Sequence, residues 1–146
     1  MKKFLASILA VLTVLSMAAV PVTAMASGLD DGINICSSDY IGSFNSYAQK
    51  GSSSGKMDVT FIITSPIRAS KIGVSQIEII KASGAHVTTI YGSTANGLQA
   101  SNISTHAATY TFSGTPGVEY CAKVTFYVSD ADGSDSRTMI TNSVKV

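Results

Sequence analysis

The chain has 146 residues, of which 45% are hydrophobic and 13% charged, and 10 Lys and Arg against 9 Asp and Glu give a net charge of +1. This length predicts a single domain. The composition excludes a disordered chain, the two cysteines are too few for a disulfide-dense miniprotein, and the small net charge argues against a nucleic-acid-binding protein.

The first 26 residues have the three regions of a secretory signal peptide in order. Lys2 and Lys3 form a basic head, residues 4–20 form an apolar run, and Ala24-Met25-Ala26 is a small-residue cleavage motif. Cleavage after Ala26 starts the exported chain at Ser27, and cleavage after Ala24 is the competing site. A retained membrane anchor is the alternative, but the apolar run is short for a span of about 20 residues.

Removal of this segment takes away two lysines, so that 8 basic residues face 9 acidic ones and the net charge becomes −1. The rest of the chain has no second apolar run of spanning length, no cysteine at a lipidation position and no sorting motif. We therefore expect a secreted, extracellular protein that is free of the membrane after signal removal and either released or loosely associated with the cell wall. The two-lysine head and the short apolar region are typical of a bacterial export signal.

Residues 27–38 look irregular, and residues 39–146 are predicted to form one all-β domain. The expected strands are residues 40–47, 56–64, 74–81, 86–91, 107–112, 118–128 and 137–146. Ser65-Pro66 is expected to end the second strand, residues 92–106 form a polar stretch, and residues 130–135 form a turn. Seven short strands predict an antiparallel, immunoglobulin-like sandwich, and a small β-barrel is the alternative.

Alternation predicts which side chains of the strands face the core. In residues 56–64 one face carries Met57, Val59, Phe61 and Ile63. Ile77 and Ile79, and Tyr110 and Phe112, are expected to point inward on their own strands. The longest strand places Val118, Tyr120, Ala122, Val124, Phe126 and Val128 on one face, and Glu119, Cys121, Lys123, Thr125 and Tyr127 on the other.

Residues 114–124, GTPGVEYCAKV, resemble the penultimate strand of fibronectin type III and immunoglobulin-like domains. The resemblance implies that Tyr120 is the tyrosine whose hydroxyl anchors a corner of the fold. It covers only this strand and the hairpin that follows, and it implies a fold and no activity.

The wider layout is similar to a family of small secreted proteins of Gram-positive bacteria whose function is not established. The residues that carry this resemblance are 71–75 with Ile77 and Ile79, 114–117 with Tyr120 and Val124, 133–138, and 141–144. It covers most of the exported chain, but the family supplies no catalytic or ligand residues. Cys36 and Cys121 are not part of the shared pattern.

Cys36 and Cys121 are the only cysteines, and an exported chain favours a disulfide bond between them. The bond closes a loop of about 85 residues, for which loop entropy predicts about 4 kcal/mol of stabilisation. Because alternation places Cys121 on the outer face, the bond would tie the N-terminal segment across a sheet surface. Two free thiols and an intermolecular bond are the alternatives.

Residues 130–135, DADGSD, contain three carboxylates that suggest a weak calcium site at Asp130, Asp132 and Asp135. A calcium loop needs Gly at its sixth position and a distal Glu, whereas here the sixth residue is Asp135 and no Glu follows. The Asp-Gly pair between two strands indicates a hairpin turn instead. We therefore expect no metal here.

The residues do not predict catalysis or a cofactor. His86 and His106 lie in different segments without a partner at metal-ligand spacing, and we expect both to be solvated. Ser and Thr make up 32 of the 120 residues after residue 26, so a Ser-His-Asp combination carries no information, and no G-x-S-x-G motif occurs. We expect no catalytic residues and no cofactor.

Exposed tyrosines are the last feature, and Tyr127, Tyr91 and Tyr47 form a candidate binding surface for a protein or glycan. Cross-strand packing is the ordinary role of such rings, and the sequence favours it over binding. The sequence thus favours a non-enzymatic extracellular module that binds a protein, a wall polymer or a glycan. The alternative is a small diffusible effector, an enzyme inhibitor or a minor enzyme.

Overall fold

The computed structural model describes residues 34–35 and 38–146, which form ten strands. The predicted signal peptide therefore lies outside the described residues. The strands are β1 (Asn34–Ile35), β2 (Ser43–Lys50), β3 (Lys56–Ala69), β4 (Lys71–Lys81), β5 (His86–Tyr91), β6 (Gln99–Ala100), β7 (Ile103–Ser113), β8 (Glu119–Asp130), β9 (Gly133–Ile140) and β10 (Val144–Lys145). The described residues contain no helix, as the sequence predicts.

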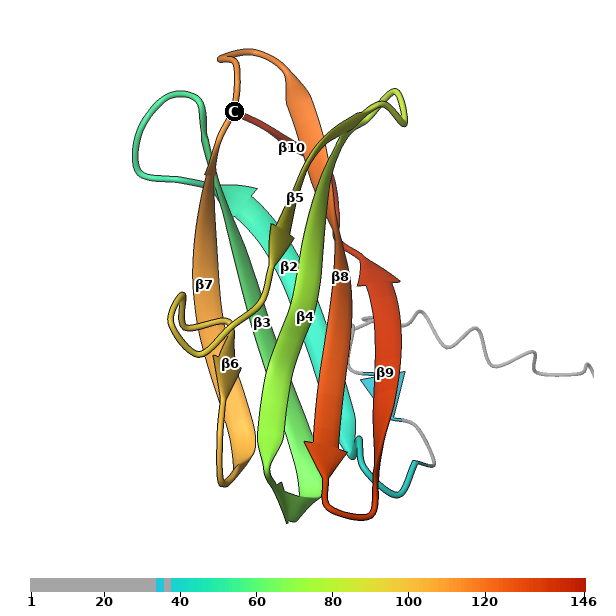
Figure 1. Ribbon diagram of the computed structural model, residues 1–146. Coiled ribbons are helices and arrows are strands. Elements are labelled where there is room, and N and C mark those ends of the chain that lie inside the picture. Colours follow the sequence, from blue (N-terminus) through green and yellow to red (C-terminus); the bar gives the residue numbers. More distant parts are fainter. Residues whose placement is uncertain (1–33, 36–37) are drawn as a thin grey trace, which may run out of the picture.

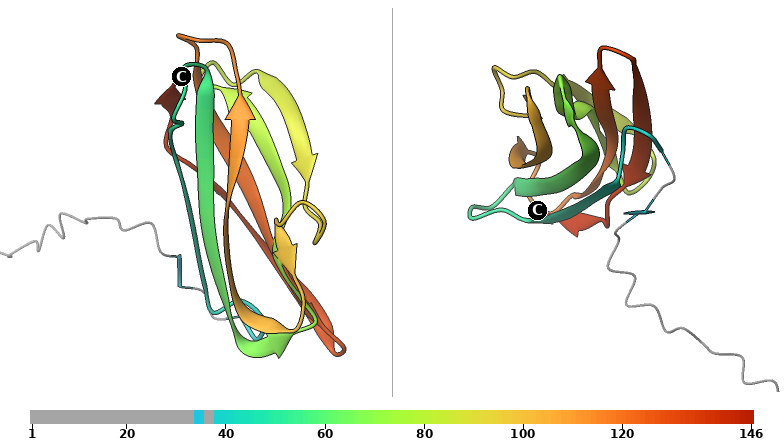
Figure 2. Two further views of the ribbon diagram at one scale, coloured as in Figure 1. Left: turned by 90° about the vertical axis from the view of Figure 1, so that its left-hand side faces the viewer. Right: turned by 90° about the horizontal axis from the view of Figure 1, so that it is seen from below.

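The strands form two antiparallel sheets that face each other (Figures 1 and 2). The first sheet has the order β1-β2-β3-β7. The second has the order β10-β8-β4-β5, with β6 also paired to β4 and β9 to β8. In the described part of the chain the strands thus form two open sheets rather than the single closed sheet of the barrel alternative.

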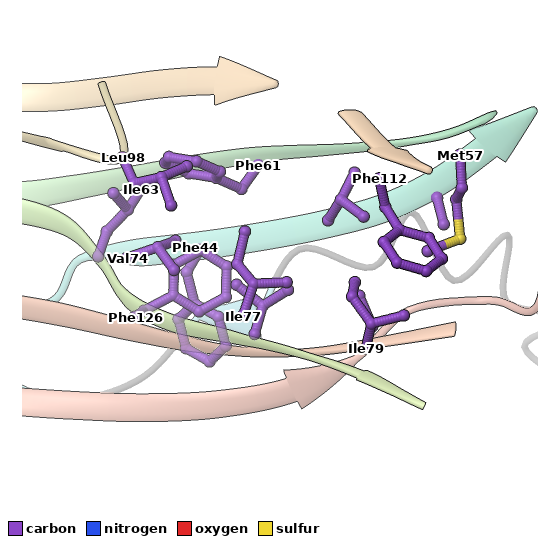
Figure 3. Packing of buried hydrophobic residues seen from close by; sticks show 14 of the residues in the cluster. Phe44, Met57, Phe61, Ile63, Val74, Ile77, Ile79, Leu98, Phe112 and Phe126 are labelled. Carbon is purple, nitrogen blue, oxygen red and sulfur yellow. The ribbon is translucent and has the colours of Figure 1, made fainter. Parts of the chain in front are cut away.

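The inner faces of the two sheets supply the hydrophobic core, which Figure 3 shows from close by. The Phe126 ring of β8 lies 4.9 Å from the Phe44 ring of β2 and 6.3 Å from the Phe61 ring of β3, measured between centroids. All the residues predicted to point inward on β3 and β8 are buried, apart from the half-buried Val118 that precedes β8. The two-residue alternation therefore predicts the core correctly in these two strands.

The predicted end of the second strand at Ser65-Pro66 is wrong, because β3 continues to Ala69. The pairing of β3 with β7 is regular as far as Thr64 and resumes only at Ala69. Pro66 lies inside this irregularity, where a missing N–H does not interrupt the regular ladder.

Other boundaries also differ from the sequence prediction. The first strand of the predicted set begins at Ser43 rather than at residue 40, and β1 at Asn34–Ile35 falls in the stretch expected to be irregular. The turn expected over residues 130–135 shrinks to Ala131 and Asp132, because Asp130 already pairs with Gly133. Most of the acidic segment therefore belongs to the paired strands β8 and β9 rather than to the turn between them.

The predicted last strand is divided into β9 and β10, and Asn142 lies between them. Its side chain reaches the first sheet, where its Oδ1 accepts the N–H of Ala48 at 3.0 Å and its Nδ2 donates to the carbonyl of Ala48 at 2.8 Å. Thr141 meanwhile bonds to β8, since its Oγ1 accepts the N–H of Ala122 at 3.0 Å. The break in the strand thus lets one side-chain amide join the edges of the two sheets.

We predict that Asn142→Ala lowers the free energy of unfolding by about 1–3 kcal/mol, because it removes two hydrogen bonds to a backbone that has few other partners there. Urea unfolding of the purified protein measures the change. Ser143→Ala, an exposed neighbour in the same link, is the control and should change the free energy of unfolding by less than about 0.5 kcal/mol. Equal losses in the two variants would contradict the bridging role of Asn142.

Candidate functional site

The outer face of the first sheet carries the side chains that alternate along each strand with those of the core. Tyr47 of β2 pairs with Thr60 of β3, which pairs in turn with Thr109 of β7. In the next row Ile62 lies between Asn45 and Ala107. Directly paired residues of antiparallel strands share a face, so these two rows lie side by side on the surface.

A shallow hollow of about 210 Å³ lies across these two rows. Its lining residues are Asn45, Tyr47, Thr60, Phe61, Ile62 and Ala107. The side chains of Tyr47 and Ile62 stand at its rim and are 47% and 45% exposed, so two large apolar groups lie next to each other on the surface. The hollow is therefore an apolar depression flanked by an aromatic ring.

Hydroxyl groups surround the hollow and engage the charged groups of the same face. The hydroxyls of Thr60 and Thr109 lie 3.0 Å apart and share a hydrogen bond. The carboxylate of Asp58 accepts the hydroxyl of Thr111 at 2.6 Å, and the ammonium group of Lys56 donates to the Ser113 hydroxyl. The hollow itself is lined by no charged residue, so its chemistry is apolar, and the charged side chains Asp58 and Lys56 lie farther along β3 on the same face.

A second depression, of about 490 Å³, opens where the β3–β7 pairing is irregular. Its lining residues are Pro66, Ile67, Arg68, Asn102, Ile103, Ser104 and Thr105. Asn102 has a φ of 58° and is the one residue other than glycine with a positive φ in the described ranges. Asparagine tolerates this left-handed conformation better than other residues, and it turns the chain into β7. We call this depression the Arg68 groove.

The three tyrosines of the predicted binding surface do not lie together. Tyr47 is on the outer face of the first sheet, whereas Tyr91 and Tyr127 belong to β5 and β8 of the second. Tyr91 is 72% exposed, while Tyr127 is half-buried beside Gly73. Sequence alternation assigns each ring to a face of its own strand, but which strands share a sheet is decided only by the fold.

The acidic hairpin does not bring its carboxylates together. Asp130 accepts the hydroxyl of Ser70 at 2.8 Å, while Asp135 accepts hydrogen bonds from the Ser38 hydroxyl and from the Arg137 guanidinium. Asp132 is exposed in the turn. Within the described ranges no three His, Cys, Asp or Glu side chains are arranged to hold a metal ion.

Hydrogen bonding changes the pKa values of two of these carboxyls. The Ser70 hydroxyl and the backbone N–H of Ala131 lower the pKa of Asp130 below its ordinary value. For Asp135, partial burial raises the pKa, but the Ser38 hydroxyl, the Ser136 N–H and the Arg137 charge together outweigh burial and lower it. Both carboxylates are therefore held ionised by structural partners.

The proposed disulfide cannot be followed, because Cys36 lies outside the described residues. Cys121 is 7% exposed, although alternation places it on the outer face. Cys121 pairs with Ile80 of β4 in the second sheet, and it is buried although period-two patterning assigns it to solvent. Alternation reports the face of a residue and not its exposure.

The histidines are held by hydrogen bonds within the fold. His86 Nε2 lies 2.9 Å from the Thr89 hydroxyl, and His106 Nε2 donates to the carbonyl of Gly97 at 2.9 Å. The ring of His106 also packs edge-on against Phe61 at 5.6 Å, so the expectation that both histidines are fully solvated is wrong for His106.

Tyr120 has the contact that a corner tyrosine requires. Its hydroxyl oxygen accepts the backbone N–H of Thr115 at 3.0 Å, and its ring packs edge-on against Phe112 at 5.1 Å. The Thr115 N–H, helped by the charge of Lys81, lowers the pKa of the Tyr120 phenol although burial opposes this. The bond links β8 to the turn that precedes it.

The pKa of Asp135 predicts an acid-dependent stability. A carboxyl whose pKa is lowered by folding contributes stability above its unfolded pKa, near 3.8, and loses it as the pH falls through the lowered folded value. We therefore predict that Asp135→Asn reduces the free energy of unfolding at pH 7 and that the difference from the natural protein shrinks below pH 3.8. Urea titrations at pH 7 and pH 2.5 measure it, with Asp132→Asn as the control for loss of one charge. A difference that is equal at the two pH values would contradict the assignment.

No family model, no curated protein and no solved structure matches this chain. No helix in the described residues is long and apolar enough to cross a membrane. The hollow beside Tyr47 and the Arg68 groove are therefore the features that point to a function.

Proposed function

We propose that this chain is a secreted, non-enzymatic binding module that recognises a glycan or wall polysaccharide through the outer face of its first sheet. The observation that carries the proposal is the apolar hollow between Tyr47 and Ile62, set in a surface of hydroxyl groups. The export signal expected in residues 1–26 agrees with an extracellular ligand.

The chemistry of the hollow suits a sugar ring. A pyranose presents C–H groups on its faces and hydroxyls around its edge. The exposed Tyr47 ring offers an aromatic surface for the C–H face, and Ile62 with Ala107 offers apolar contact below. The Thr60 and Thr109 hydroxyls can both donate and accept, as a ligand rich in hydroxyls requires.

A glycan also fits the face better than a protein partner does. The centre of a stable protein interface is a cluster of large anchors, most often Trp, Tyr and Arg, packed in desolvated pockets. The hollow has a small volume and one exposed aromatic ring, that of Tyr47, because the other aromatic residue of its lining, Phe61, is buried in the core. Such a surface matches one ring of an extended polymer.

We also infer an immunoglobulin-like sandwich of the fibronectin type III kind. Immunoglobulin-like domains group their first, second and fifth strands in one sheet and the third with the last two in the other. With β2 taken as the first strand, the observed orders β2-β3-β7 and β9-β8-β4-β5 follow that grouping, with β5 as an added edge strand. The Tyr120–Thr115 hydrogen bond supports the same inference.

We predict that Tyr47→Ala weakens binding to the polysaccharide about tenfold, the equivalent of about 1.4 kcal/mol, because the stacking surface is removed. Co-sedimentation of the exported protein with purified Gram-positive cell walls and insoluble β-glucan and galactan measures it. Tyr91→Ala is the matched control, since this ring is more exposed but belongs to the second sheet, and its binding should stay unchanged.

Two outcomes would overturn the proposed function. One is the absence of binding to any of these polymers by the unaltered protein. The other is an equal loss in the Tyr47 and Tyr91 variants. Fractionation of producing cells gives an independent measurement: protein bound to the wall and released by competing polymer supports the proposal, and protein found only in the medium argues for a diffusible effector.

A further inference from the structure

The hollow and the Arg68 groove lie along one continuous track on the first sheet. On β7, Ala107 lines the hollow and Thr105 lines the groove, and residues two apart on a strand share a face. Thr105 pairs with Thr64, so a row of hydroxyls connects the two depressions. At about 3.3 Å per residue, Ile62 and Arg68 are at most about 20 Å apart along β3.

The far end of this track carries an unneutralised cation. Arg68 is exposed, lines the groove and forms no ion pair within the described part of the chain. The carboxylate of Asp130, on the hairpin at the same end of the molecule, is already engaged by Ser70 (Figure 1). The guanidinium therefore keeps its charge and its donors for a ligand.

The groove is built to hold an oxyanion beside that charge. A guanidinium presents a planar fork of N–H groups that matches a carboxylate or a phosphate in two parallel hydrogen bonds. Asn102, Ser104 and Thr105 line the same groove and carry amide and hydroxyl donors. The left-handed backbone at Asn102 turns the chain into β7 beside this groove.

We propose that the ligand is an acidic glycan, in which the C–H face of one sugar ring lies in the hollow at Tyr47 while an oxyanion of the same polymer binds Arg68. This inference rests on the proposed function and narrows its substrate class. The oxyanion is either the carboxylate of a uronic acid or the phosphate of a polyol-phosphate polymer, which share the chemistry that Arg68 recognises.

The test compares three soluble polymers by calorimetry or affinity electrophoresis: a neutral galactan, polygalacturonate and poly(glycerol phosphate) that carries sugar substituents. We expect the unaltered protein to bind at least one acidic polymer about tenfold more tightly than the neutral one, with an affinity that falls as salt rises. Arg68→Gln should abolish this preference and leave neutral binding unchanged, and Arg68→Lys should restore it in part, since it keeps the charge but not the fork.

Lys145→Gln is the matched control for charge, because this exposed lysine lies in β10 at the opposite end of the molecule (Figure 1). It should leave both the preference and its salt dependence unchanged. The two acidic polymers distinguish the source of the oxyanion: preference for polygalacturonate identifies a carboxylate, and preference for poly(glycerol phosphate) identifies a phosphate.

The outcomes separate this inference from the proposed function. Equal binding of neutral and acidic polymers, or an Arg68→Gln variant that keeps the acidic preference, overturns the inference and leaves the Tyr47 site standing. An equal loss of neutral and acidic binding in Arg68→Gln also overturns it, because Arg68 then acts on the fold. Failure of the unaltered protein to bind any of the three polymers overturns the inference, and failure to bind cell walls and β-glucan as well overturns both proposals.

Discussion

The packing of Phe126 between Phe44 and Phe61 is the contact on which the rest of the molecule depends. Burial of an aromatic ring of this size stabilises a fold by about 3 kcal/mol, and these three rings come from β8, β2 and β3, which belong to both sheets. Once these rings are buried, the alternation of side chains along a strand fixes whether each neighbouring residue lies on the inner or the outer face.

This alternation also determines which side chains lie on the outer face of the first sheet. Thr60 and Ile62 face outward because Phe61 and Ile63 face inward, and the antiparallel register then places Tyr47 and Ala107 beside them. Ile62 is 45% exposed on β3, which lies between β2 and β7, so the exposed part of its side chain gains nothing from burial. This apolar surface beside Tyr47 is the physical reason to propose a ligand for this face.

Regular strand structure is interrupted at two places, and the two interruptions have different structural effects. The break at Asn142 turns its side-chain amide toward the carbonyl and N–H of Ala48, which joins the two sheets by hydrogen bonds to the β2 backbone. The irregularity in β3 after Thr64 has the opposite effect, since it separates β3 from β7 and opens the groove that Arg68 lines. The first interruption links the two sheets, and the second forms a depression on the surface.

The sequence by itself determined the fold class and the inner face of β3 and β8, because alternation depends only on neighbours along the chain. It also pointed to Tyr47 and to Tyr120, through exposure and through resemblance. It could not separate Tyr47 from Tyr91 and Tyr127, because the sheet to which a strand belongs is set by pairing between distant segments. Arg68 and Asn102 were missed, since neither belongs to a motif and the Pro66 signal predicts a strand end rather than a bulge. Only the tertiary structure decided which residues share the proposed binding face, because it alone brings β2, β3 and β7 into register.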